Sequence, residues 1–241
     1  MKWVLVSMMR RNSERLPEKL LSKIWTPIGF VSLMEWNAHR IREWAKHLEC
    51  DYFLGVGPDD ADRLASAGFA VFVRSQESLD GENGIDIYRD IPPKFDGYDW
   101  ALHVNACCPF VELDSVQKFM AAGEKAVPLD AGAFPGFVDC GVVRTGDGTR
   151  IFPPPDATVW PNTKTDQKFI TTCRSLVMMP AKCVGRQLFP MDILIPLGRR
   201  TAEHLDVDYP DDMDLVSAYA AYKWHIRDAH DRWSGRWSDY Q

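Results

Sequence analysis

Several cations and a hydroxyl group gather in a short polar stretch directly after the first apolar run of the chain. The apolar run, Trp3 to Val6, is rich in β-branched and aromatic residues, as expected of a buried strand, and the polar stretch after it holds Arg10, Ser13 and Lys19. In open α/β sheets, ligands bind at the carboxyl ends of the strands. The stretch is therefore a candidate phosphate cradle, and the alternative is an ordinary solvated loop.

Two aspartates near the other end of the chain form a second candidate group. Asp206 and Asp208 are two residues apart, so on a strand both carboxylates project to the same side and can address one cation. Mg²⁺ takes oxygen ligands and shares its shell with substrate phosphates. The alternative is helix capping, in which Asp208 or Asp211 begins a helix over residues 212–222. The two interpretations are compatible, with Asp211 and Asp212 serving the helix.

Both groups lie in segments that resemble motifs of one enzyme family. Residues 9–20 read MRRNSERLPEKL, similar to the R-x-x-S-x-R-L-P-x-K core of the cytidylyltransferases related to CMP-sialic acid synthetase and to their spore-coat polysaccharide branch. Residues 202–215 read AEHLDVDYPDDMDL and resemble the I-D-I-D-T-P-E-D-L motif of that family, in which an Asp-bearing strand runs into a helix. The resemblance covers about residues 1–220.

The resemblance implies roles for residues of both motifs and of two strand ends. Arg10, Ser13 and Lys19 would hold the triphosphate of CTP, with Lys19 and Arg10 as the catalytic cations, and Asp206 and Asp208 would bind Mg²⁺. The nucleotide-binding set is completed by two residues at strand ends, Arg74 and Asn105. For Arg74, a surface arginine is an equal alternative.

The acceptor is less defined by the resemblance. Lys164, Gln167 and Arg174 fall where family members bind an anionic acceptor, but ordinary surface roles are the alternative for all three. Glu14 and Leu20 depart from the sialic acid pattern, so the acceptor can equally be another 2-keto acid sugar, a phosphate or a phosphonate.

The expected function is transfer of CMP from CTP to an acidic acceptor with release of pyrophosphate. A degenerate member that binds nucleotide without turnover is the alternative that Glu14 and Leu20 favour. A glycosyltransferase-like enzyme is a third hypothesis, because residues 206–208 formally match D-x-D, although their late position argues against it.

Cysteine chemistry is a weaker hypothesis. Cys107 and Cys108 follow a predicted strand, but no partner base can be named, so we interpret them as compact loop residues. The six cysteines form no C-x-x-C pair, which favours reduced thiols. His103, inside the same strand, is interpreted as a core histidine.

Composition excludes several classes of protein. The 241 residues carry a net charge of −6, which argues against nucleic-acid binding through clustered cations. No apolar run approaches the roughly 20 residues that cross a bilayer, and the first run is too short for a signal peptide. We expect a cytoplasmic protein.

The elements that must position these residues alternate between strand and helix. This alternation predicts an α/β fold with a Rossmann-like, three-layer, mostly parallel sheet. Expected helices cover 28–49, 61–67, 85–91 and 113–122, and expected strands cover 51–56, 69–73, 99–104, 125–129, 137–143 and 173–179. Residues 185–198 read as an irregular crossover.

Four regions follow from this pattern and from the resemblance. Residues 1–131 are the nucleotide-binding core, and the Gly- and Pro-rich residues 132–185 are an insertion that forms an acceptor and dimerisation flap. Residues 186–222 return to the core with the metal-binding strand and helix, and 223–241 form an aromatic tail. The expected assembly is a homodimer.

Overall fold

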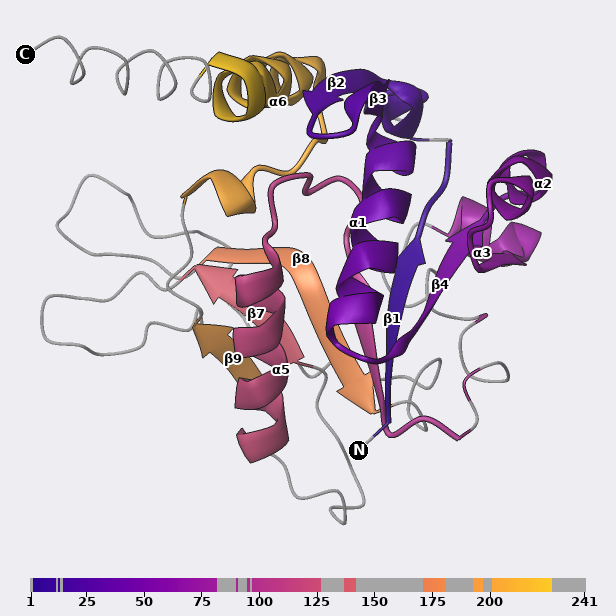
Figure 1. Ribbon diagram of the computed structural model, residues 1–241, viewed down its shortest axis with the longest axis vertical. Coiled ribbons are helices and arrows are strands. Elements are labelled where there is room, and N and C mark those ends of the chain that lie inside the picture. The colour runs from indigo at the N-terminus through magenta and orange to yellow at the C-terminus, as the bar shows by residue number, and fades with distance from the viewer. Residues whose placement is uncertain are drawn as a thin grey trace, which may run out of the picture.

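The computed structural model describes residues 2–11, 13, 15–81, 90, 95, 97–126, 137–141, 171–180, 193–196 and 201–226. Its centre is a seven-stranded sheet of order β5-β4-β1-β6-β8-β7-β9 (Figure 1). The strands are β1 (Trp3–Met8), β4 (Asp51–Val56), β5 (Val71–Val73), β6 (Trp100–Val104), β7 (Phe137–Gly141), β8 (Thr171–Pro180) and β9 (Ile193–Pro196). β5, β4, β1 and β6 are parallel, which confirms the predicted α/β class.

Strand β1 is the middle of the parallel half of the sheet. All six of its residues are buried, because β4 and β6 pair with its two edges and both faces are covered. Its side chains alternate between two hydrophobic clusters, with Trp3 and Leu5 in one and Val4, Val6 and Met8 in the other. Such two-sided burial explains the continuous apolar run at the start of the sequence.

The helices of the described residues pack mainly on the side of the larger cluster. α1 (Leu33–His47) and α5 (Leu113–Ala126) lie there, and α6 (Pro210–Ala221) packs beside their upper ends against the β2–β3 hairpin (Figure 1). Shorter elements are α2 (Pro58–Ser66), α3 (Gln76–Asp80), η1 (Lys19–Leu21), η3 (Thr201–His204) and η4 (Tyr222–Ile226). Within the described residues, no helix has the length and apolar character of a membrane span.

The start of the first long helix differs from the prediction. Residues 29–32 form β3 (Gly29–Ser32), which pairs with β2 (Lys23–Thr26) in an antiparallel hairpin. The helix begins only after Ser32, whose Oγ accepts a hydrogen bond from the Glu35 amide while Glu35 Oε2 accepts one from the Ser32 amide. This capping box fixes the boundary, and the apolar Phe30 and Val31 belong to the strand.

Two later predictions also need correction. α5 continues through Lys125 and Ala126, so the expected strand 125–129 is wrong over its first two residues, and the rest lies outside the described residues. Strand β9 forms within the expected irregular crossover 185–198, because the edge of β7 offers it a parallel partner.

The expected helix 85–91 lies outside the described residues. The regional boundaries remain a prediction, although β7 and β8 from the predicted insertion extend the central sheet.

A buried arginine joins α1 to the loop after β6. The Arg40 guanidinium donates to Asn37 Oδ1 at 2.8 and 3.1 Å and to the carbonyl oxygens of Cys108 at 2.8 Å and Asn105 at 3.2 Å. Asn37 in turn donates to Ser7 Oγ at 2.7 Å. Burial lowers the pKa of Arg40 to about 10, so it stays charged at neutral pH. The network therefore fixes the β6 loop against β1 and α1.

His103 is a buried titratable group within the sheet. It lies inside β6, pairs with β1 and is shielded from solvent on both faces, as predicted for a core histidine. Burial, helped by the nearby charge of Arg74, lowers the pKa of His103 to about 3. The imidazole is therefore neutral in the folded protein.

Replacing Arg40 should destabilise the fold strongly. In Arg40→Met, three buried acceptors lose their donor, and each such loss costs about 1–3 kcal/mol. We expect a fall of about 3 kcal/mol or more in the free energy of unfolding, measured by urea titration. Arg42→Met, on the same helix but partly exposed, is the matched control and should cost less than about 1 kcal/mol. Equal losses in the two variants would contradict the role of the network.

His103 should make stability fall in mild acid. The unfolded side chain takes up a proton below about pH 6.5, whereas the folded one does not until about pH 3, so protons favour unfolding across that interval. His103→Gln removes this contribution. Between pH 7.5 and pH 5, we expect the free energy of unfolding from urea titration to fall more for the wild type than for the variant, by up to about 1.4 kcal/mol per pH unit below pH 6.5. Parallel pH profiles would refute the assignment.

Candidate nucleotide site

The predicted site residues converge at the carboxyl edge of the parallel strands. β1 and β6 are parallel neighbours, so Arg10 and Asn105, which follow them, lie at the same edge of the sheet. The segment before α6 reaches this edge as well, because the Val207 amide donates to the Cys107 carbonyl oxygen at 2.9 Å. The structure thus brings together the two motifs that lie near opposite ends of the sequence.

Asp208 is bound by two cations of the first motif. Lys19 Nζ donates to Asp208 Oδ1 at 3.0 Å and to the Val207 carbonyl oxygen at 2.8 Å, while Arg15 Nη1 donates to Asp208 Oδ2 at 2.8 Å. Lys19 is mostly buried and Arg15 is half exposed. Both oxygens of Asp208 therefore face positive charges, and the predicted phosphate cradle and metal ligand form one cluster.

Asp206 differs from Asp208 in its surroundings. Its Oδ1 is buried and has no hydrogen-bond partner among the described residues. Burial, together with the negative charge of Asp208, raises the pKa of Asp206 to about 6. Lys19 and Arg15 act in the opposite direction but do not cancel it. A buried carboxylate oxygen without a donor is a costly arrangement that a bound cation would relieve.

Lys19 remains charged in spite of its burial. Burial disfavours the charged amine, but the Cys107 sulfur and the hydrogen bond and charge of Asp208 outweigh it, so the pKa of Lys19 lies above its ordinary value. A lysine held in this state presents a fixed positive charge at the edge of the sheet. That charge is suited to a phosphate group.

The loop that carries these cations is anchored by the neighbouring arginine. Arg11 forms a two-pronged ion pair with the buried Asp60 of α2, with Nε–Oδ2 and Nη2–Oδ1 distances of 2.8 Å. Arg63 adds a third contact to Asp60 at 3.3 Å. The Arg11 hydrogen bond holds the pKa of Asp60 below its usual range despite burial. Arg11 is therefore a structural residue of the loop.

The other predicted nucleotide ligands lie at the same edge but already make contacts with the protein. Arg10 Nη1 donates to the carbonyl oxygens of Leu79 at 2.9 Å and Gly81 at 3.1 Å. Arg74 is buried and donates to the Met9 carbonyl oxygen at 3.1 Å and to Ser78. It is therefore not a surface arginine, and these contacts tie the end of β1 to α3.

Asn105 shapes the loop after β6. Its Oδ1 accepts from the Cys107 amide at 3.0 Å, which closes a tight turn. Burial raises the pKa of Cys107 to about 11, so this thiol is protonated at neutral pH and the catalytic-cysteine hypothesis loses support. Cys50 and Cys107 are free thiols, as expected.

The predicted strand through Asp206 and Asp208 is wrong. Residues 205–208 form an irregular segment between η3 and α6, which is held by the contacts of Val207 instead of a strand ladder. The N-cap residue of α6 is Tyr209, so the expected capping by Asp208 or Asp211 is wrong; Asp212, in the first turn, closes the start of the helix, because its Oδ2 accepts from the amides of Asp208 at 3.0 Å and Tyr209 at 2.8 Å. Asp212 thus stabilises the start of the helix, as predicted, whereas the carboxylate of Asp208 binds Lys19 and Arg15.

The remaining predicted residues divide into two groups. Lys164, Gln167 and Glu14 lie outside the described residues, as does the side chain of Arg174 in β8. Ser13 is partly buried in the cation loop. Leu20 is buried in η1 against the main core. Leu20 is therefore a packing residue that holds Lys19 in place.

Sequence reasoning missed two residues of this site. Arg15 was not named as a site residue, although it is the arginine of the R-L-P part of the motif. Its place in that motif was a signal that could have identified it. Glu203 is buried, and its Oε2 accepts from the Glu112 amide at 3.1 Å at the start of α5. This contact anchors the segment that carries Asp206 and Asp208. No feature of the sequence distinguishes Glu203 from a surface acid.

The site is better suited to a magnesium ion that shares its ligands with a substrate than to a metal bound by protein side chains alone. Among the described residues, no group of three or more His, Cys, Asp or Glu side chains could hold a metal by itself. Mg²⁺ usually binds one or two carboxylates together with substrate phosphates. Asp206, with its unpartnered buried oxygen, and Asp208 match that incomplete donor set.

No family model matches the chain, and no curated protein does. Solved structures do match it in fold, at low sequence identity. A CMP:2-keto-3-deoxy-manno-octonic acid synthetase, solved as a complex with CTP, matches with a TM-score of 0.62 at 14% identity, over 92% of this chain and 100% of that one. A cytidylyltransferase from Leptospira borgpetersenii matches with a TM-score of 0.56 at 13% identity, over 92% of this chain and 86% of its own.

A third match is a 4-diphosphocytidyl-2C-methyl-D-erythritol synthase from Anaerococcus prevotii, with a TM-score of 0.53 at 11% identity, over 90% of this chain and 96% of that one. The matched proteins use different acceptors, so the similarity is one of architecture. The chain has the nucleotidyltransferase fold of the cytidylyltransferases, with the parallel sheet β5-β4-β1-β6 at its centre.

Proposed function

We propose that the chain is a Mg²⁺-dependent cytidylyltransferase that transfers CMP from CTP to an acidic acceptor and releases pyrophosphate. The observation that carries the proposal is the cluster of Lys19, Arg15, Asp206 and Asp208 at the carboxyl edge of β1 and β6. A triphosphate needs cations and its metal needs carboxylates, and this cluster holds both. The fold of the cytidylyltransferases adds independent support.

Binding of CTP exchanges partners within this cluster. Lys19 and Arg15 release the carboxylate of Asp208 and bind the β- and γ-phosphates, where their charge stabilises the leaving pyrophosphate. The carboxylates of Asp206 and Asp208 would then hold Mg²⁺, which would supply Lewis-acid activation of the α-phosphate. The phosphates would take the place of the Asp208 carboxylate beside Lys19 and Arg15, so these two cations would keep a negatively charged partner.

Arg10, Ser13, Arg74 and Asn105 complete the proposed nucleotide site, and their contributions differ. Arg10 donates to the carbonyl oxygens of Leu79 and Gly81, so its proposed role as the second catalytic cation requires that it exchange these contacts for phosphate. Arg74 acts by holding the end of β1, since its guanidinium is occupied by Met9 and Ser78. Asn105 shapes the turn beside Cys107 and offers its amide to the base or sugar.

A 2-keto acid sugar is the proposed acceptor, with a phosphate or phosphonate as the alternative, and Lys164, Gln167 and Arg174 as candidate anion ligands. The protein is further proposed to act as a cytoplasmic homodimer. Pyrophosphate release from four nucleoside triphosphates, each tested against keto-acid sugars, phosphates and phosphonates, tests base and acceptor together.

A second candidate is a nucleotide-binding protein without turnover. The contacts of Arg10 with Leu79 and Gly81 favour it, because a cation bound to carbonyl oxygens is less available to phosphate. Calorimetric titration with CTP separates the two candidates. Binding that gains nothing from Mg²⁺, together with no pyrophosphate release for any acceptor, would favour the second.

Replacing the two carboxylates should separate activity from stability. Asp206→Asn and Asp208→Asn should each lower pyrophosphate release about 100-fold or more, because the metal loses a ligand. In metal-free buffer, Asp206→Asn should stabilise the fold by about 1 kcal/mol, since it removes a buried carboxylate that repels Asp208. Asp211→Asn, exposed on the first turn of α6, is the control. Wild-type activity in Asp206→Asn would exclude the metal role.

The two cations should contribute mainly to the triphosphate. Lys19→Met and Arg15→Met should each weaken CTP binding about tenfold or more in calorimetry, because each removes a charged donor. CMP, which lacks the β- and γ-phosphates, should bind both variants and the wild type alike. The control is Lys23→Met, an exposed cation of the neighbouring hairpin. An equal loss of CTP and CMP binding would contradict the assignment.

A further inference from the structure

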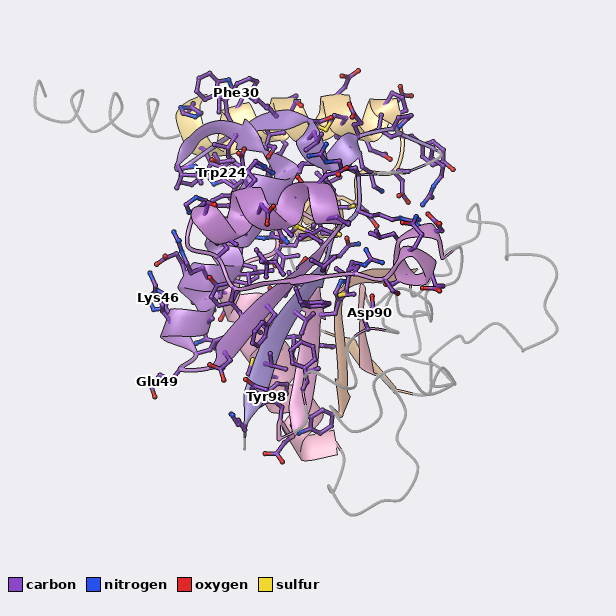
Figure 2. The ribbon with its side chains drawn as sticks, turned by 90° about the vertical axis from the view of Figure 1, so that its right-hand side faces the viewer. Phe30, Lys46, Glu49, Asp90, Tyr98 and Trp224 are labelled. Atoms are coloured by element: carbon purple, nitrogen blue, oxygen red, sulfur yellow. The ribbon has the colours of Figure 1, made fainter. Side chains whose placement is uncertain are left out.

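The β2–β3 hairpin exposes large aromatic side chains. Trp25 and Phe30 face each other across the hairpin, with ring centroids 5.1 Å apart, and are 46% and 51% exposed. His225 of η4 lies edge-on to Trp25 at 4.8 Å. We call these three residues the aromatic patch. Figure 2 shows Phe30 at the outer rim of the molecule, beyond Trp224.

The geometry of the hairpin imposes this exposure. Ile24 and Thr26 point inward and are buried, which forces Trp25 outward by the alternation of a strand. The turn is closed by a hydrogen bond from Thr26 Oγ1 to the Gly29 carbonyl oxygen at 2.8 Å. Tyr222 of η4 and Ile28 of the turn are also about half exposed. Exposed aromatic side chains in contact with one another, such as Trp25 and Phe30, indicate an interaction site.

The part of the chain that follows η4 has the composition to cover the patch. Residues 227–241, which lie outside the described residues, read RDAHDRWSGRWSDYQ. Trp233, Trp237 and Tyr240 are spaced so that they share one face of a helix. Their aromatic rings match the rings of Trp25 and Phe30, since edge-to-face and offset pairs of this kind are favourable. The three arginines and three aspartates of the segment cancel, so net charge does not oppose docking.

We propose that residues 227–241 dock on the aromatic patch of the same chain. The chain reaches the aromatic patch just before this segment, because His225 contacts Trp25 and the segment begins two residues later. The seven residues from Ile226 to Trp233 span up to about 25 Å when extended, which is ample for a return to Phe30. A second copy of the chain is the competing occupant.

Docking ties together the two elements that present the site. η1, which carries Lys19, leads into β2, and Asp208 leads into α6 and η4. A segment bound across β2, β3 and η4 restrains both. The inference is independent of the proposed function, because it rests on the exposed hairpin and on the sequence after Ile226.

Hydrogen exchange and limited proteolysis of the full chain test the docking. In Trp233→Ser/Trp237→Ser, the amides of residues 23–32 should exchange about tenfold faster than in the wild type, because the hairpin loses its cover. Conversely, Trp25→Ser/Phe30→Ser should speed tryptic cleavage after Arg232 and Arg236 about tenfold, as followed by intact mass. Ser234→Ala/Ser238→Ala, in the same segment but off the aromatic face, is the control and should change neither rate.

Two results would overturn the proposal. One is unchanged exchange of residues 23–32 and unchanged cleavage in both aromatic variants. The other is protection that rises with protein concentration together with a dimer that becomes a monomer in Trp25→Ser/Phe30→Ser, which would make a second copy the occupant. Protection that is independent of concentration supports docking within one chain.

Discussion

The ion pairs of Asp208 with Lys19 and Arg15 are the contacts on which the candidate site depends. They join the loop after β1 to the segment before α6, and Lys19 and Asp208 are 189 residues apart in the sequence. Around them, the Val207 amide binds the Cys107 carbonyl oxygen, and the Lys19 amine binds the Val207 carbonyl oxygen. Both peptide groups that flank Val207 are thus fixed, which sets the positions of Asp206 and Asp208.

The charges of Asp208, Lys19 and Arg15 compensate one another, whereas Asp206 takes no part in these ion pairs. Asp208 is neutralised by two cations, whereas the buried Oδ1 of Asp206 has no hydrogen-bond partner among the described residues. Stability alone would not favour such a group, because burial of an unpaired carboxylate oxygen costs free energy. A carboxylate oxygen that lacks a hydrogen-bond partner, in well-packed surroundings, is expected where a ligand completes the site.

Much of the scaffold could be predicted because local patterns specify it. The two-sided apolar runs of β1 and β6 and the amphipathic pattern of α5 depend on burial, which the sequence reflects directly. The start of α1 was misplaced because Phe30 and Val31 fit both helical and strand periodicity, and the capping box at Ser32 decides between them. The strand expected at Asp206 and Asp208 was wrong because alternation alone does not provide a pairing partner.

The sequence by itself determined the fold class, the cation-rich loop and the acidic pair, since residue type and short-range spacing carry that information. Only the tertiary structure decided which charges meet. It assigns Arg11 to Asp60, Arg15 and Lys19 to Asp208, and Arg74 to the end of β1, although all four cations look alike in the sequence. The reason is physical: an ion pair depends on distance in space, and the partners here are brought together by a parallel sheet that places distant strand ends at one edge.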